Sequence, residues 1–407
     1  MSLATTSSLR GAHIRAFNAR NVRRADLWLL LCVCALAIIG FLVLLSANRS
    51  VSTTAPVHLK QAMFFVAGCG VALFVSCFDH RFLVSIAPLM YTVFLALLLC
   101  VLFIGVEVRG GQRWLHFGPF GFQPSEYTKL ALVFTLAWYF TTIGRKIERL
   151  PYFLLAFAIG GLPAYLIFKQ PDLGTAATLG PITVAMLYIA GCKRWHLAAI
   201  VVLALAVTPI AWSQLEDYQK KRIMTVVDPS ADPQGSGYHT IQSMITVGSG
   251  GLTGKGYMVG TQTYLSYLPE HHTDFIFSLL SEEFGFVGSV TVLFLFLFLF
   301  FRGLRLARNS TDMAGSLLAV GVVTLLAFHV FVNVSITIGI LPVTGLPLPF
   351  LSYGGSFYLT VMTSIGILLS VNARRGMFDY LEPPGTSSIY GYSWRRNERI
   401  HHKHQLS

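Results

Sequence analysis

The run Val292-Leu-Phe-Leu-Phe-Leu-Phe-Leu-Phe-Phe301 decides the fold class of this chain. No polar side chain interrupts it, and it lies inside a longer apolar stretch. A strand of a transmembrane barrel would alternate apolar and polar residues, whereas an unbroken apolar run is typical of a membrane-spanning helix. Of the 407 residues 54% are hydrophobic and only 12% are charged, against about 25% charged in soluble proteins. The sequence therefore predicts an all-α polytopic membrane protein.

Ten apolar stretches are predicted to span the membrane, several of them near the lower length limit of about 17 residues. They lie at 26–47, 62–78, 82–105, 125–142, 151–168, 174–191, 195–213, 275–301, 314–338 and 353–372.

Lysine and arginine residues set the predicted orientation, because they are enriched in cytosolic segments. With the N-terminus in the cytosol, every inside connection carries a cation and most of the 30 lysines and arginines lie inside. Both termini are then cytosolic. The predicted organisation is a basic tail at 1–24, a membrane domain at 25–372 with one large outer loop at 214–274, and a second tail at 373–407.

The net charge of +12 calls for no nucleic-acid partner, because topology and anionic inner-leaflet lipid account for it. The six cysteines fall in or at the edge of predicted spans. We therefore expect neither a disulfide framework nor a zinc site.

The end of the large outer loop carries the first candidate site. Glu270, His271, His272 and Asp274 stand within five residues where the chain re-enters the membrane. A carboxylate at such a boundary is costly to bury, which marks Asp274 as a functional candidate. Asp274 could instead cap the following helix, with Thr273 competing for that role.

Two further polar groups lie at the outer ends of predicted spans. Glu126 and Lys129 are three residues apart and share a helix face, so they form either a structural ion pair or a polar patch that lines a cavity. Asp172 either caps the next helix or contributes to a site. Ser125 is predicted to cap the helix that Gln-Pro-Ser opens.

Three outer cations, Arg113, Arg222 and Lys255, come from different loops. If they converge, they would bind an anionic lipid headgroup, a diphosphate above all. If they are scattered, they are ordinary surface charge.

Several long motifs resemble the SEDS family (shape, elongation, division and sporulation) of the bacterial cell wall. They occur in family order and cover nearly the whole membrane portion. They are Gly111-Gln-Arg-Trp-Leu115, Gln123-Pro-Ser-Glu126 with Lys129, Lys169-Gln-Pro-Asp-Leu-Gly-Thr175, Gly237-Tyr-His-Thr-Ile-Gln-Ser243, Gly248-Ser-Gly-Gly-Leu252, Leu268-Pro-Glu-His-His-Thr-Asp-Phe-Ile-Phe277, Glu282-Glu283 and Pro342-Val-Thr-Gly-Leu-Pro-Leu-Pro-Phe-Leu-Ser-Tyr-Gly-Gly-Ser356.

The resemblance implies a peptidoglycan glycosyltransferase of the bacterial cytoplasmic membrane that polymerises lipid II with a class B penicillin-binding protein. The Lys169–Thr175 and Gly237–Ser243 stretches are more similar to the rod-shape (elongation) branch than to the division branch. The family's essential acid maps onto Asp274, and its paired acid and lysine map onto Glu126 and Lys129. The sequence departs from the family at Gln112 and at 263–266.

The expected chemistry is attack by a sugar 4-hydroxyl on the anomeric carbon of a lipid-linked chain, with inversion and release of undecaprenyl diphosphate. Asp274 is the expected base. The expected substrate-binding residues are Arg113, Glu126, Lys129, Asp172, Arg222, Lys255, Glu270 and His272. A divalent cation, Mg or Mn, could share the diphosphate, and Asp274 would then be a ligand rather than a base. The competing classes are a lipid II flippase, which should show sites at the membrane midplane, and a scaffold in which Asp274 is dispensable.

Overall fold

A computed structural model gives the arrangement of the chain. It describes residues 26–47, 57–108, 111–117, 120–213, 220, 223–226, 228, 236–260 and 272–374.

The described chain is almost entirely helical. Its helices of 14 or more residues are α1 (Leu27–Ala47), α2 (Val57–Cys77), α4 (Ala87–Ile104), α5 (Pro124–Ile143), α6 (Leu150–Lys169), α7 (Leu173–Ile189), α8 (Arg194–Ser213), α10 (Ser236–Ser249), α12 (Ile276–Arg308), α13 (Met313–Thr337) and α14 (Gly355–Ala373).

A helix covers each of the ten predicted stretches, with α3 (His80–Ser85) and α4 dividing the third between them. Among the helices that the structure describes, seven are both long and apolar enough to cross a membrane: α1, α2, α4, α6, α12, α13 and α14. The prediction of an all-α polytopic membrane protein is thereby confirmed. The ten-span count and the cytosolic placement of both termini stay predictions.

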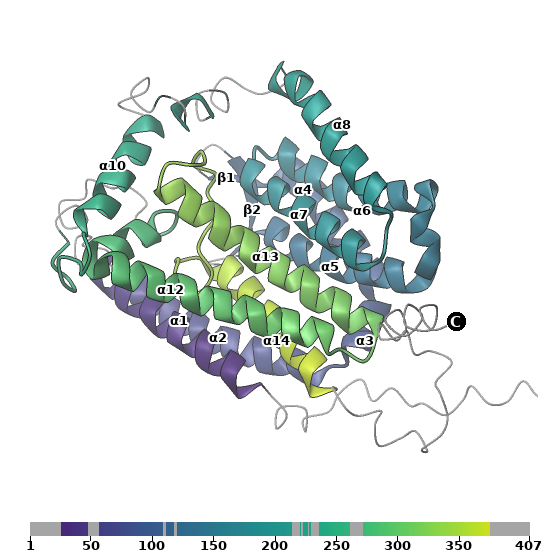
Figure 1. Cartoon of the computed structure of the whole chain (residues 1–407), viewed down its shortest axis with the longest axis horizontal. Coiled ribbons are helices and arrows are strands. Elements are labelled where there is room, and N and C mark those ends of the chain that lie inside the picture. Colours follow the sequence, from purple (N-terminus) through teal and green to yellow (C-terminus); the bar gives the residue numbers. More distant parts are fainter. Residues whose placement is uncertain are drawn as a thin grey trace, which may run out of the picture.

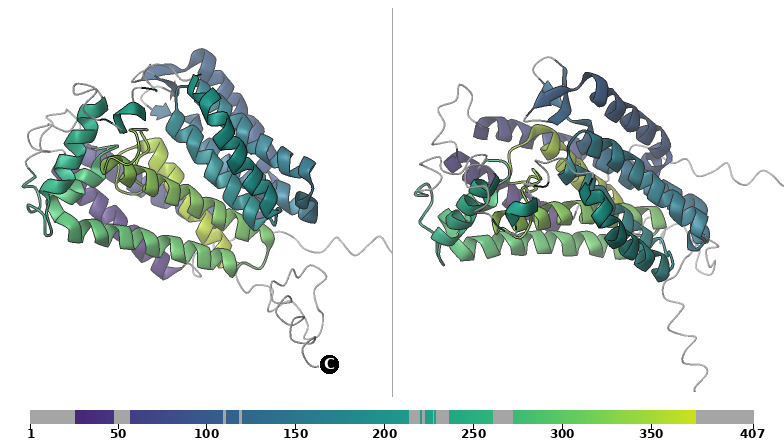
Figure 2. Two further views of the ribbon diagram at one scale, coloured as in Figure 1. Left: turned by 45° about the horizontal axis from the view of Figure 1, so that its top comes forward. Right: turned by 90° about the horizontal axis from the view of Figure 1, so that it is seen from above.

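Helix α13 lies at the centre of the bundle (Figure 1). It packs against α12 and α14 on one side and against α5 and α7 on the other. Most of its apolar span is buried inside the protein rather than presented to lipid. By contrast, α8 packs against α7 at the edge of the molecule, as both views in Figure 2 show. The central helix is therefore the one best placed to carry buried polar groups.

A small antiparallel sheet precedes α5. Its strands β1 (Val106–Val108), β2 (Gly111–Phe117) and β3 (Phe120–Phe122) pair in chain order. The sheet leads directly into α5, which begins at Pro124 with Gln123 as its N-cap residue. Proline suits this first position because its missing N–H would have no helical partner there. The predicted capping role of Ser125 is wrong, because the residue already lies inside the first helical turn.

Helix α12 is broken at Gly285, whose φ of 64° is left-handed. The break is filled by the glycine-rich segment 250–256. Phe286 N–H donates to Gly251 O at 2.9 Å, and Lys255 N–H donates to Glu282 O at 2.9 Å. These bonds satisfy backbone groups that the break leaves without helical partners, as buried non-helical backbone in a membrane requires.

The N-terminal end of α13 carries an ion-pair cluster. Asp312 caps α13 by accepting from Gly315 N, and it also contacts His80 Nε2 at 3.1 Å and Arg81 Nε at 2.6 Å. Burial would raise the pKa of Asp312, but the hydrogen bonds and charges of His80 and Arg81 outweigh it and hold that pKa well below its usual range. The charge pattern predicts this end to be cytosolic.

Candidate functional site

Asp274 is half-buried in the turn that leads into α12. The N-cap residue of α12 is Phe275, whose side chain makes no capping hydrogen bond. The alternative in which Asp274 or Thr273 is the N-cap residue is therefore wrong.

The backbone of Asp274 is fixed by α13 rather than by its own helix. Asn333, fully buried in α13, donates through Nδ2 to Asp274 O at 3.0 Å and to Leu346 O at 2.9 Å. Leu346 belongs to the irregular segment 338–354 between α13 and α14. The same segment lies against the Asp274 side chain, because Oδ2 is 3.9 Å from the position that a Cβ on Gly345 would take. Asn333 therefore joins Asp274 to this segment.

Two more contacts hold the preceding residues against the same segment. Ser352 Oγ donates to Thr273 O at 2.6 Å, and Tyr353 N–H donates to His272 O at 3.0 Å. The rings of His272 and Tyr353 also face one another at 6.3 Å. Because consecutive carbonyl groups are held in this way, the turn that carries Asp274 has a defined position.

The pair of Arg113 and Asp172 lies at the start of α7. Asp172 accepts from Thr175 N at 3.1 Å, so its predicted capping role is confirmed. Arg113 donates to the carbonyl groups of Gln170 and Pro171, and its Nη1 is 3.7 Å from Asp172 Oδ2. The Arg113 side chain stays 26% exposed.

The start of α7 reaches the same irregular segment as Asp274 does. A Cβ on Gly174 would lie 2.6 Å from Thr344 O, so the absence of a side chain allows this close approach. The adjacent Gly345 faces Asp274. The segment 344–346 thus lies against both Gly174, in the helical turn that Asp172 caps, and Asp274.

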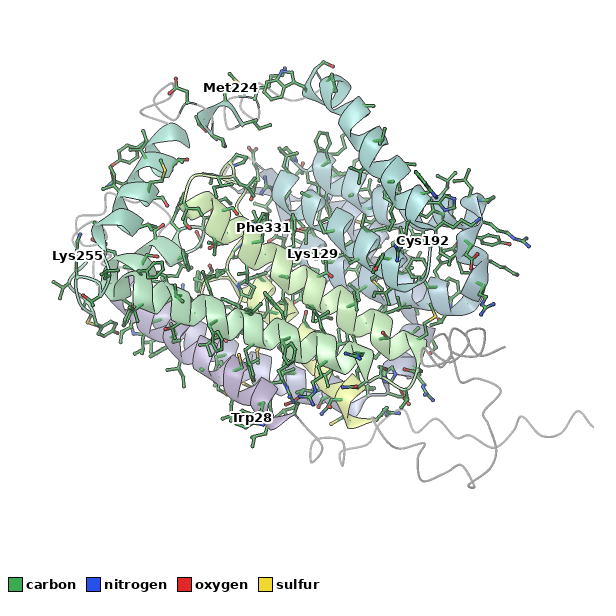
Figure 3. The ribbon with its side chains drawn as sticks, in the orientation of Figure 1. Trp28, Lys129, Cys192, Met224, Lys255 and Phe331 are labelled. Carbon is green, nitrogen blue, oxygen red and sulfur yellow. The ribbon has the colours of Figure 1, made fainter. Side chains whose placement is uncertain are left out.

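Glu126 and Lys129 form a buried ion pair on α5. Lys129 Nζ lies 2.8 Å from Glu126 Oε2, and the lysine side chain is 0% exposed. The ammonium also contacts His329 Nε2 on α13 at 3.1 Å. In this conformation Lys129 is enclosed by protein (Figure 3), so it acts on its neighbours rather than directly on a ligand.

Sequence reasoning missed His329 and Asn333. The signal was available, since both interrupt an apolar span one helical turn apart, and polar residues inside a membrane helix are functional candidates. Their partners could not be found from the sequence, because Lys129 is 200 residues away from His329.

Lys255 does not join these groups. Its Nζ pairs with Glu282 Oε1 at 2.7 Å beside the α12 break, and Figure 3 places it at the rim, well apart from Lys129. Its side chain is 27% exposed. Arg222 and Glu270 lie outside the described residues. Lys255 therefore does not converge with Arg113 as the sequence alternative required.

Within the described ranges, no three His, Cys, Asp or Glu side chains come together as a metal site. Mg²⁺ can be held by one or two carboxylates together with waters and substrate phosphates, so the expectation that Asp274 is a cation ligand stays a prediction.

The fold and these buried polar groups define a multi-pass helical membrane protein with its candidate chemistry at one end of the bundle. The family model for the FtsW, RodA and SpoVE cell cycle proteins matches residues 26–376. The chain therefore belongs to this family, which is the SEDS family that the motifs resemble. It is a multi-pass protein of the bacterial cytoplasmic membrane.

Two curated relatives illustrate the similarity. The peptidoglycan glycosyltransferase MrdB of Escherichia coli K12 is 42% identical over 295 residues, covering 72% of this chain and 79% of its own length. The peptidoglycan glycosyltransferase RodA of Treponema pallidum is 34% identical over 430 residues, covering 88% and 99%.

Two solved structures share the fold. One, from work on the coordination of polymerization and crosslinking by a peptidoglycan synthase complex, has a TM-score of 0.75 at 32% identity and covers 87% of this chain and 99% of the solved one. The rod shape determining protein RodA of Thermus thermophilus has a TM-score of 0.65 at 30% identity, with 86% and 97% covered.

Proposed function

We propose that this chain is a peptidoglycan glycosyltransferase that polymerises lipid II on the outer face of the cytoplasmic membrane during cell elongation. The activity is the one that the names of its curated relatives carry. The observation that supports a site at Asp274 is the position of this residue at the entrance to α12, where Asn333 of the central helix donates to its main-chain carbonyl and fixes the backbone that carries the carboxylate.

In the proposed reaction, the 4-hydroxyl of one lipid II attacks the anomeric carbon of the chain carried by another lipid diphosphate. A new carbon–oxygen bond forms while the bond to the diphosphate breaks, and its electron pair leaves with undecaprenyl diphosphate. Asp274 accepts the hydroxyl proton, a role worth about 10²–10⁴ in rate. The leaving group gains charge, so cations near it lower the barrier.

Arg113 is the described residue best suited to contact the diphosphate. It is partly exposed, and it pairs with Asp172, which caps the α7 turn whose Gly174 lies against the segment 344–346 that faces Asp274. Arg222 is proposed for the same task from the sequence. The buried Lys129 and Glu126 are assigned a supporting role, which is to fix the packing of α5 against α13 behind the site.

We propose a class B penicillin-binding protein as the partner. Such a protein would crosslink the strands that this chain polymerises, and the TM-score of 0.75 with the chain from a peptidoglycan synthase complex supports the assignment.

The test is polymerisation of labelled lipid II by the purified full-length chain with its partner, for wild type and Asp274→Asn. Asparagine keeps the size and removes the charge, so we expect product from wild type and a loss of about 10²–10⁴-fold in the variant. Glu107→Gln, at an exposed carboxylate of β1, is the matched control and should keep its activity.

Full polymerisation by Asp274→Asn would refute the base assignment. No product from wild type in an intact complex would favour lipid transport or a scaffold role. A transporter is expected to hold its site near the midplane. The buried ammonium of Lys129 lies only five residues into α5, about 8 Å along the helix from its outer end.

A further inference from the structure

His329 is a buried residue that contacts both Lys129 of the buried ion pair and the irregular segment 338–354 that faces Asp274. It lies on α13 with 0% exposure. Its Nε2 is 3.1 Å from Lys129 Nζ, and its Nδ1 is 3.1 Å from Pro347 O. Its ring stacks on Phe357 of α14 at 4.7 Å. A single imidazole thus connects α5, α13, α14 and the irregular segment that faces Asp274.

The contacts determine which ring nitrogen of His329 carries the proton. An ammonium has three donors and no acceptor, so Nε2 has to accept from Lys129. The carbonyl of Pro347 can only accept, so Nδ1 has to donate. His329 is therefore a neutral imidazole protonated on Nδ1, and it cannot make both contacts in any other form.

The next turn of α13 continues the connection to the main-chain carbonyl of Asp274. Asn333 donates to Leu346 O, one residue before Pro347, and to Asp274 O. His329 and Asn333 are four residues apart, which places them on the same helix face. The path from Lys129 to Asp274 therefore runs through His329, residues 346–347 and Asn333, without a gap wider than 3.1 Å between hydrogen-bonded groups.

We propose that His329 is a positioning residue, which ties the buried ion pair of α5 to the segment that orients Asp274. This inference rests on the proposed function. Both contacts of the imidazole are required, because either one alone leaves the segment or the ammonium without its fixed partner. A displacement of reacting groups by about 1 Å can cost about 10²-fold in rate.

Two substitutions separate the contacts. His329→Asn keeps an amide N–H near the Nδ1 position for Pro347 O, and His329→Gln keeps an amide oxygen near the Nε2 position for Lys129. We expect each variant to lower kcat by about 10- to 100-fold per folded molecule, with KM changed less than threefold. Ser364→Ala, which removes another buried polar group that bonds within its own helix, should keep the wild-type kcat.

The polymerisation assay with labelled lipid II distinguishes the possible failures. If wild type makes no product, the proposed function fails. If wild type is active and either His329 variant keeps full kcat, the function stands and the positioning role is refuted. A total polymerisation rate that falls only in proportion to the folded fraction would also refute it, since that result would show a purely structural role.

A second measurement does not depend on activity. The ¹⁵N shifts of histidine-labelled wild type, with the His329 signal assigned by its loss in His329→Gln or His329→Asn, report the tautomer. We expect the Nδ1–H form at neutral pH. An Nε2–H form or an imidazolium would overturn the assignment, because neither can accept from Lys129.

Discussion

Removal of the ammonium from Lys129 should destabilise the protein far more than removal of the whole ion pair. Lys129→Met leaves the carboxylate of Glu126 without its partner 2.8 Å away, in a site where the lysine side chain is 0% exposed and the glutamate 5%. An uncompensated buried charge of this kind costs about 3–5 kcal/mol. The imidazole of His329 also loses its donor, and a buried unpaired acceptor costs about 1–3 kcal/mol.

The double variant Glu126→Leu with Lys129→Met removes both charges together. Apolar replacement of a buried pair is often neutral or stabilising, so only the unpaired nitrogen of His329 should remain as a cost. We expect the double variant to be at least about 2 kcal/mol more stable than Lys129→Met. The double variant should therefore be less destabilised than the sum of the two single variants, because each buried charge is tolerated only with its partner.

The assay is equilibrium unfolding of the purified chain in mixed micelles with increasing dodecyl sulfate, followed by circular dichroism. Lys146→Met, an exposed cation on the 3₁₀ turn after α5, is the control and should change the unfolding free energy by less than about 0.5 kcal/mol. The second single variant is Glu126→Leu. If the changes in unfolding free energy of Lys129→Met and Glu126→Leu add up to that of the double variant within about 0.5 kcal/mol, the two side chains are not energetically coupled and the ion-pair interpretation is refuted.

Two further perturbations test other parts of the fold. Gly285→Ala should destabilise the chain by about 1–3 kcal/mol, because φ is 64° and a Cβ would lie 2.3 Å from Gly254 N; Gly70→Ala, with nothing within 4 Å in a helix, should be neutral or stabilising in the same unfolding assay. Asp312→Asn should cost about 1.5–3 kcal/mol at pH 7. Since the folded pKa of Asp312 is lowered by His80 and Arg81 despite its burial, wild type should lose this stability as the pH falls below about 4. The variant should lack that part of the pH dependence, and identical pH profiles would contradict the role of the cluster.

Much of the helical architecture could be predicted from the sequence, because apolar runs of spanning length allow few structures other than helices. The boundaries were less predictable where glycine and proline act locally. The expected span 275–301 is part of α12, which continues to Arg308 and is broken at Gly285. A single glycine in an apolar run does not by itself predict a helix break. Here the break depends on segment 250–256, which donates and accepts backbone hydrogen bonds across it.

The candidate site was only partly predictable for a related reason. Asp274, Asp172 and the Glu126–Lys129 pair are exceptional in sequence, because each puts charge at a membrane boundary. Their partners are ordinary in sequence and distant along it. Asn333 reaches Asp274 across 59 residues, and no local pattern encodes such a contact. The spacing of Glu126 and Lys129 left an ion pair as one of two alternatives, and the structure shows that pair, yet the spacing did not indicate that His329 shares the ammonium.

The position of Asp274 depends more on α13 than on the helix it precedes. A buried histidine and a buried asparagine are expensive in a membrane helix when their donors are unpaired, and His329 Nδ1 and Asn333 Nδ2 both bond to carbonyl groups of the irregular segment after α13. The carbonyl groups of that segment have no partners within a regular helix. His329 and Asn333 can donate to two of them because α13 lies at the centre of the bundle. Each element thus makes the other tolerable in the membrane. The backbone of Asp274, which carries the carboxylate that we assign as the base, is held by the contact between them. Substitutions of His329 and Asn333 on α13 should therefore affect turnover through the position of Asp274.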